Sequence, residues 1–99
     1  MSDMKFDWDV EKEQINIEKH GISFLTATRV FFDENRIEIY DFMHSKDEDR
    51  YVTIGAVDDG AFYVLFVVYT ERREVIRLIS ARKAMKSERR LYDQNRNGS

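Results

Sequence analysis

Hydrophobic residues near the start of the chain are spaced as on one face of a helix, whereas those in the second half alternate with polar residues or form continuous runs. The helical spacing predicts one helix over residues 10–21 and a second over residues 23–35. Gly21 is a natural stop for the first helix, and Ser23 is a natural cap for the second. A last helix is predicted over residues 85–95, where one side is charged and the other is apolar.

Alternating apolar residues and short polar breaks predict a sheet in the second half of the chain. Its four expected strands are residues 36–42, 50–57, 61–70 and 74–80. The connections between them are short, so consecutive strands are expected to run antiparallel as a meander. Residues 4–9 form either a short strand or an anchor for the first helix.

Together these elements predict an α+β fold with two N-terminal helices, a four-stranded antiparallel meander sheet and a C-terminal helix. The length of 99 residues predicts a single domain over residues 1–99. Residues 96–99 are expected to form a frayed tail, because "RNGS" has no apolar residue with which to anchor it.

The composition narrows the class of protein. The chain has no cysteine, which fits the reducing cytoplasm and excludes thiol chemistry. Its longest apolar run, "AFYVLFVVY", has nine residues and is too short to cross a membrane as a helix. The N-terminal "MSDMKFDWD" is acidic and lacks the apolar stretch of a signal peptide. We therefore expect a cytoplasmic protein that does not contact a membrane.

Charge is distributed unevenly along the chain. Residues 1–76 hold 9 Lys and Arg against 17 Asp and Glu, whereas residues 77–99 hold 7 Lys and Arg against 2 Asp and Glu. The C-terminal segment therefore carries a net charge of +5 within a chain of net charge −3. A basic patch of this kind suits a phosphodiester backbone, because each neutralised phosphate releases counterions. The pattern therefore favours a nucleic acid as partner.

Arg77 is the first cation of the basic segment. Strict alternation places Val75, Arg77 and Ile79 on one face of the last strand. A buried guanidinium without an anion is costly. Arg77 therefore either reaches the open side of the sheet or pairs internally with an acid such as Glu71 or Glu74.

The last helix continues the basic segment. A turn of about 3.6 residues places Lys86, Arg89 and Arg90 on one side of it. Arg82 and Lys83 join that side if the helix begins earlier. The strand and the helix are then expected to present one continuous cationic patch, although a simply solvated amphipathic helix has the same pattern.

Several stretches of the sequence resemble the BrnT family of toxins from bacterial type II toxin–antitoxin systems, which share a RelE-like ribonuclease fold. The matching stretches occur in the family's order: "FDWD" (6–9), "KHGISF" (19–24), "VFFDE" (30–34), "RYVTIG" (50–55), "FVVYTER" (66–72) and "VIRLISARKAMKSERRLY" (75–92). Met85 departs from the family, which commonly has Ser or Thr there as part of a capping box with the acid at Glu88.

The resemblance implies a toxin that cleaves RNA and inhibits translation. It also implies a cognate ribbon-helix-helix antitoxin, similar to BrnA, that binds the toxin and represses their shared operon. Operator DNA is then contacted only through the antitoxin. The alternative is a non-catalytic module whose C-terminal basic patch binds RNA or a protein.

Cleavage of RNA without a metal ion or other cofactor uses the 2′-hydroxyl as nucleophile. The protein must then supply a base, cations for the phosphorane charge and an acid for the 5′-oxygen. Arg77 and Arg82 are the candidates for the phosphorane, because a guanidinium forks onto two phosphate oxygens. The candidates that bind the RNA backbone or close the site are Lys83, Lys86, Arg89, Arg50 and Arg72.

The base has two candidates. His20 lies in "KHG", and histidine side chains titrate near neutrality; the alternative is that it only complements the dipole at the helix end. Glu71 in "TER" is the second candidate, unless it merely pairs with a neighbouring arginine. Tyr92 either stacks on a base or donates a proton, or else it packs in the core. The acid clusters lack metal-ligand spacing with histidine, so no metal site is expected.

Overall fold

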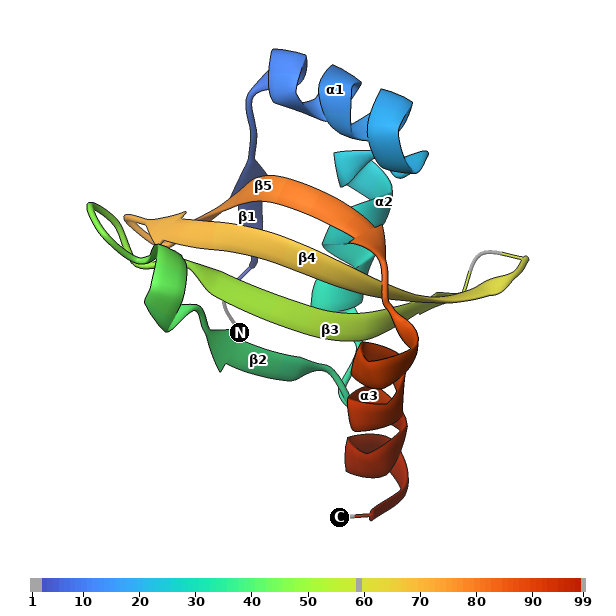
Figure 1. Ribbon diagram of the computed structural model, residues 1–99. Coiled ribbons are helices and arrows are strands. Elements are labelled where there is room, and N and C mark those ends of the chain that lie inside the picture. The colour runs from blue at the N-terminus through green and yellow to red at the C-terminus, as the bar shows by residue number, and fades with distance from the viewer. Residues whose placement is uncertain (1–2, 59, 99) are drawn as a thin grey trace.

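The computed structural model describes residues 3–58 and 60–98 (Figure 1). In chain order the elements are β1 (Lys5–Asp7), α1 (Val10–His20), α2 (Phe24–Thr28), η1 (Arg29–Phe32), β2 (Ile37–Tyr40), η2 (Phe42–His44), β3 (Tyr51–Asp58), β4 (Phe62–Arg72), β5 (Val75–Lys83) and α3 (Lys86–Gly98). The two η elements are short 3₁₀-helices. No helix among these residues is long and apolar enough to cross a membrane.

The sheet has five strands in the order β1-β5-β4-β3-β2. Strands β2 to β5 form the expected antiparallel meander, but β1 pairs with β5 in parallel. The α+β class is therefore confirmed. The prediction of a four-stranded antiparallel sheet is wrong, because the sheet is five-stranded and mixed, and the expected RelE-like fold differs from the structure in this detail. Three residues are too few for a clear alternation. Phe6 nevertheless pairs with Ile76, and its ring packs against the core.

Element boundaries also differ from expectation. The second helix ends at Thr28 and continues as the 3₁₀-helix η1. Strand β4 runs on to Arg72, and the turn consists of Arg73 and Glu74, both with positive φ. Helix α3 extends to Gly98, so residues 96–98 of the expected frayed tail are helical. Residue 99 of that tail lies outside the described residues, as does Asp59 between β3 and β4.

One face of the sheet is covered by α2, η1 and the residues around them (Figure 1). Phe24, Val30 and Leu65 are fully buried at its centre. The close approach of η1 to β3 depends on Gly55, because a Cβ there would lie 2.7 Å from Val30 Cγ1. Asp9 caps α1 and Ser23 caps α2, and Gly21 ends α1 at φ 71°.

Helix α1 covers the part of the β5 edge that β1 leaves unpaired. Asn16 is buried there and takes the place of a neighbouring strand. Its side-chain nitrogen donates to the carbonyl of Ala81 at 2.8 Å, and its side-chain oxygen accepts from the N–H of Ala81 at 3.1 Å. The same nitrogen donates to the carbonyl of Ile22 at 2.9 Å. This arrangement fixes the end of α1, and with it His20, beside β5.

The opposite face of the sheet, called the open face below, is covered at one end by α3. Tyr92 packs there against Val52, Ile54 and Val64. Its hydroxyl donates to Asp33 at 2.6 Å. In Figure 1, α3 stands at the right-hand end of the strands, and the short helix η2 lies at their left-hand end.

A β-bulge lies in the middle of β5. Val68 of β4 pairs with Ser80 and the next residue, Tyr69, pairs with Leu78, so Ile79 is an extra residue without a partner in β4. Strict alternation would place Arg77 and Arg82 on opposite faces, because they are five residues apart. The bulge reverses the alternation between them and brings both side chains to the open face.

Candidate functional site

Cross-strand pairs define how the cations lie on the open face. Arg82 pairs with Phe66 of β4, and Arg77 pairs with Thr70. Directly opposed residues point to the same side of a sheet, and Phe66, Val68 and Thr70 alternate regularly along β4. The two arginines therefore share this face but are separated by five residues of β5, or about 15 Å at the usual rise per residue. They form two sites rather than one.

The first site is the Arg77 cluster, consisting of Arg50, Arg72 and Arg77. Arg77 forms an ion pair with Asp7 at 3.2 Å, rather than with either of the glutamates considered as partners. Arg72 binds Glu48 through Nε and through a second hydrogen bond of 2.9 Å from its terminal nitrogen. The hydrogen bonds from Arg72 outweigh partial desolvation and, together with the charges of all three arginines, lower the pKa of Glu48.

Thr70 is the β4 residue that pairs with Arg77, and it lies two residues before Arg72. It is 1% exposed, and its hydroxyl oxygen makes no hydrogen bond to any residue that the structure describes. A buried hydroxyl without a partner costs free energy, and such a group beside guanidiniums is suited to an incoming anion.

The second site surrounds Arg82. Its guanidinium binds Glu88 through two hydrogen bonds of 2.8 and 2.9 Å and lies over the ring of Phe66, 4.0 Å from the ring centroid. The hydrogen bonds from Arg82 are the main cause of the lowered pKa of Glu88, and they outweigh its desolvation. Glu88 also accepts from the backbone N–H of Met85 at 2.7 Å. One half of the capping box therefore persists, and it ties Arg82 to the start of α3.

A groove of about 560 Å³ opens beside Arg82, between the end of α1 and the segment that joins β5 to α3. Its lining residues are Lys19, His20, Arg82, Lys83 and Met85. Residues from α1 and from the end of β5 thus line one exposed surface, although His20 and Arg82 are far apart in the sequence. We call this surface the Arg82 groove.

Three further residues were expected to bind the RNA backbone: Lys86 and Arg89 lie on α3, and Lys83 contacts the ring of Tyr63. Lys86 and Arg89 are exposed in the first turn of α3. The guanidinium of Arg89 lies 5.8 Å from the ring centroid of Phe62, and the ammonium of Lys83 lies 5.0 Å from that of Tyr63.

Two expected site residues do not join these sites. Glu71 pairs with Ile76, so its side chain points to the face opposite Arg77 and Arg82. Tyr92 is 2% exposed, so its ring has no free face for a nucleobase. Desolvation and the hydrogen bond to Asp33 raise its pKa. Its packing alternative is therefore the one that the structure supports, and the expectation of stacking on RNA is corrected.

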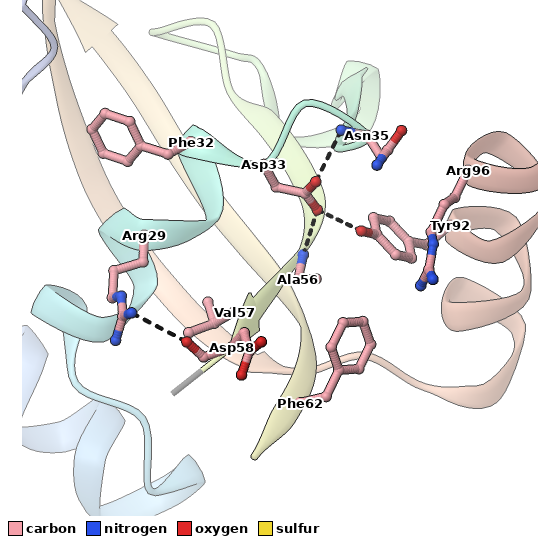
Figure 2. Close-up of a pocket in the computed structure, with 10 residues that line it drawn as sticks. All are labelled: Arg29, Phe32, Asp33, Asn35, Ala56, Val57, Asp58, Phe62, Tyr92 and Arg96. Carbon is pink, nitrogen blue, oxygen red and sulfur yellow. Dashed lines mark hydrogen bonds between the residues drawn. The ribbon is translucent and has the colours of Figure 1, made fainter. Parts of the chain in front are cut away.

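Asp33 holds the end of α3 against the sheet (Figure 2). Besides Tyr92, it accepts from the backbone N–H groups of Ala56 at 2.8 Å and Asn35 at 2.9 Å. Burial alone would raise the pKa of Asp33, but these three hydrogen bonds and the charge of Arg96 outweigh burial and lower it. Sequence reasoning missed Asp33, because its only signal was a place in the "VFFDE" stretch.

Sequence reasoning also missed the carboxylates Asp7, Glu48 and Glu88 as partners of the site arginines. Two of these pairs join distant segments, so no local spacing predicts them. Within residues 3–58 and 60–98, no three His, Cys, Asp or Glu side chains form a group that could hold a metal ion.

Comparison with known proteins gives the chain a family. Residues 8–88 match the family model described as the ribonuclease toxin BrnT of type II toxin–antitoxin systems. The fold is similar to the crystal structure of the ribonuclease toxin BrnT from Brucella abortus, with a TM-score of 0.57 and 25% sequence identity. That match covers 85% of this chain and 100% of the Brucella chain. No curated protein sequence matches the chain significantly.

Proposed function

The chain belongs to the BrnT family of ribonuclease toxins of type II toxin–antitoxin systems, and from this premise we propose that it cleaves RNA in the Arg82 groove without a metal ion. The observation that carries the proposal is that His20, Arg82 and Lys83 line one groove. The matched family is a ribonuclease family, and this groove brings the imidazole of the "KHG" stretch together with cations suited to a phosphate.

In the proposed reaction, His20 accepts the proton of the ribose 2′-hydroxyl as the 2′-oxygen attacks phosphorus. Arg82 stabilises the additional negative charge on the non-bridging oxygens of the phosphorane. The bond from phosphorus to the 5′-oxygen then breaks, and that oxygen takes a proton from water in the exposed groove. The hydroxide that remains takes the proton from His20, which restores both the water and the neutral imidazole. The products are a 2′,3′-cyclic phosphate and a free 5′-hydroxyl.

Arg82 is held for this task by its own contacts. The bidentate pair with Glu88 and the ring of Phe66 fix the plane of the guanidinium, and 28% of its side chain remains exposed. A fixed and partly desolvated guanidinium stabilises developing charge without reorganising during the reaction. Glu88 acts here as a positioning residue.

The Arg77 cluster serves in this proposal as the binding site for another phosphate of the same strand. Its distance of about 15 Å from Arg82 is too great for both arginines to contact one phosphate. Arg50, Arg72 and Arg77 lie around Glu48, and Thr70, which pairs with Arg77 across the strands, has a buried hydroxyl without a hydrogen-bond partner among the described residues. Lys86 and Arg89 extend the cationic surface along α3.

Incubation of the purified protein with RNA in EDTA tests the proposal. We expect the wild-type protein to cleave RNA and the double variant Arg77→Ala, Arg82→Ala to lose cleavage while retaining its fold by circular dichroism. The double variant also serves as the control for contaminating ribonucleases. Cleavage that requires added metal ions, or that the double variant retains, would contradict the proposal.

The family implies an antitoxin partner and an RNA substrate. We propose a ribbon-helix-helix antitoxin similar to BrnA, which covers residues 77–90 and through which alone the complex contacts operator DNA. The cationic segment in an otherwise acidic chain supports this, because covering the RNA surface neutralises the toxin directly. A toxin that stops translation acts where ribosomes are, so we place the protein in the cytoplasm. A complex that leaves residues 77–90 exposed would contradict this arrangement.

A further inference from the structure

We propose that the pocket between β3, β4 and the second half of α3 binds an unpaired nucleobase of the RNA, beyond the Arg82 groove. The inference rests on the proposed function, because it concerns the same RNA strand. The pocket has a volume of about 650 Å³, which is within the usual range for small-molecule sites. Figure 2 shows it opening around Asp33, with Phe62 and Arg96 on one side and Arg29 and Asp58 on the other.

Cations and aromatic rings alternate on the way from the Arg82 groove to this pocket. Arg82 lies over the ring of Phe66, and four residues earlier in β4 the ring of Phe62 faces α3. The guanidiniums of Arg89 and Arg96 each lie 5.8 Å from the centroid of the Phe62 ring. This combination of a cationic track and an aromatic platform is the means by which proteins bind single-stranded nucleic acid.

Phe62 is the stacking platform in this proposal. Its side chain is 45% exposed, which is unusual for a phenylalanine in a strand of the main sheet. A nucleobase that stacks on this ring would cover apolar surface, and its phosphate would lie near Arg89 or Arg96.

The polar groups around the pocket suit a base better than a bare phosphate. Asn35 and Asp58 supply an amide and a carboxylate, which recognise the donor and acceptor edge of a base. Arg29 donates to the carbonyl of Asp58 at 3.2 Å and so helps to hold that rim. The charge of Asp33 is already compensated by its three hydrogen bonds, so it does not repel the RNA as an unpaired carboxylate would.

The pocket is preformed. Tyr92 and Asn95 attach α3 to the opposite wall, through Asp33 at 2.6 Å and the carbonyl of Asn35 at 2.9 Å. The platform and the cations are therefore held in place before RNA arrives, which reduces the entropy lost on binding.

Fluorescence anisotropy with a short, labelled 2′-O-methyl oligoribonucleotide tests the proposal. The methyl group blocks the nucleophile, so binding is measured without cleavage. We expect Phe62→Ala to weaken binding about tenfold and Phe62→Tyr to keep it, because the tyrosine retains the ring. The matched control is Phe42→Ala, which removes another phenylalanine, 81% exposed in η2 and outside the pocket, and is expected to change nothing.

Arg96→Gln supplies a second readout, because Arg96 is exposed and its replacement leaves the core intact. We expect it to reduce the slope of log affinity against log salt by about one. Unchanged binding by both Phe62→Ala and Arg96→Gln would overturn the proposal. So would a loss of antitoxin binding without a loss of RNA binding, which would make the pocket a protein interface. Cleavage by the wild-type protein is measured separately, so failure of the proposed reaction is distinguishable from failure of this site.

Discussion

The two ends of the open face carry similar charge but are built differently. At one end, Arg50, Arg72 and Arg77 gather around Glu48, and Arg72 is 56% exposed. At the other end, Arg82 is held between a carboxylate and an aromatic ring, beside His20. His44 lines a pocket with Arg50 and Glu48 at the first end, but its ring contacts the carboxylate of Asp41. In the Arg82 groove, by contrast, His20 lies among cations, and no carboxylate lines the groove.

The difference shows that positive charge alone does not identify a reactive site. Binding a phosphate needs cations near its oxygens, and the Arg77 cluster supplies them. Cleaving the phosphodiester also needs a proton acceptor and a guanidinium held in one orientation. Only the Arg82 groove combines those features among the residues that we predicted from the sequence. We therefore expect substitutions in the Arg82 groove to lower kcat, and substitutions in the Arg77 cluster to weaken RNA binding.

The largest effect is expected at His20. Replacement by Gln removes the proton acceptor but keeps a polar side chain of similar size, so we expect kcat to fall about a thousandfold. The pH–rate profile should also lose the limb that reports the proton acceptor. His44→Gln is the control, because that histidine is exposed in η2, where it contacts Asp41. An unchanged pH profile in the His20 variant would remove its assigned role.

Matched substitutions at the two ends test the comparison directly. Arg82→Lys keeps the charge but removes the planar fork, and we expect kcat to fall about a hundredfold. Arg77→Lys makes the same change in the other cluster, and we expect kcat to stay within about twofold while KM rises. Steady-state kinetics on one RNA substrate separates these outcomes. Equal losses of kcat at both positions would show that the two ends act as one site.

Tyr92 is expected to affect stability rather than catalysis. Tyr92→Phe removes the hydrogen bond to the carboxylate of Asp33, which should lower the free energy of unfolding by about 2 kcal/mol in urea titrations. The control is Tyr40→Phe, which removes an exposed hydrogen bond to Asp49 and should cost less than about 0.5 kcal/mol. A variant of normal stability but weak RNA affinity would instead return Tyr92 to the RNA-binding surface.

The smallest effect is expected from the charge of Glu88. Its pKa is lowered in the folded protein, so its contribution to stability is present above the unfolded-state pKa and is lost as the pH falls through the folded-state value. We expect Glu88→Gln to cost about 1 kcal/mol at neutral pH. The gap between wild type and variant should close as urea titrations are taken to progressively lower pH, below the ordinary glutamate pKa of 4.5. A gap that persists in acid would show that the carboxylate charge is not its source.

Sequence patterns predicted what depends on local periodicity. The meander from β2 to β5 and the caps of α1 and α2 follow from alternation and from Gly21 and Ser23. The parallel β1 was left undecided because its three residues form too short a pattern, and its place depends on Phe6 reaching the core.

The candidate site was predictable only as a set of cations. Nothing in the spacing showed that Arg77 pairs with Asp7, because that contact requires β1 to lie beside β5. The meeting of His20 with Arg82 depends in turn on Asn16, which attaches α1 to the strand edge. The burial of Tyr92 depends on Asp33, a partner 59 residues away. Such long-range contacts leave no local signal.

The bulge at Ile79 makes the length of β5 as important as its composition. Deleting that residue would restore regular alternation and send either Arg77 or Arg82 through to the apolar side of the sheet. Relatives that change the length of this strand by one residue would therefore need a compensating irregularity elsewhere, whereas a change of two residues would preserve which side each arginine occupies.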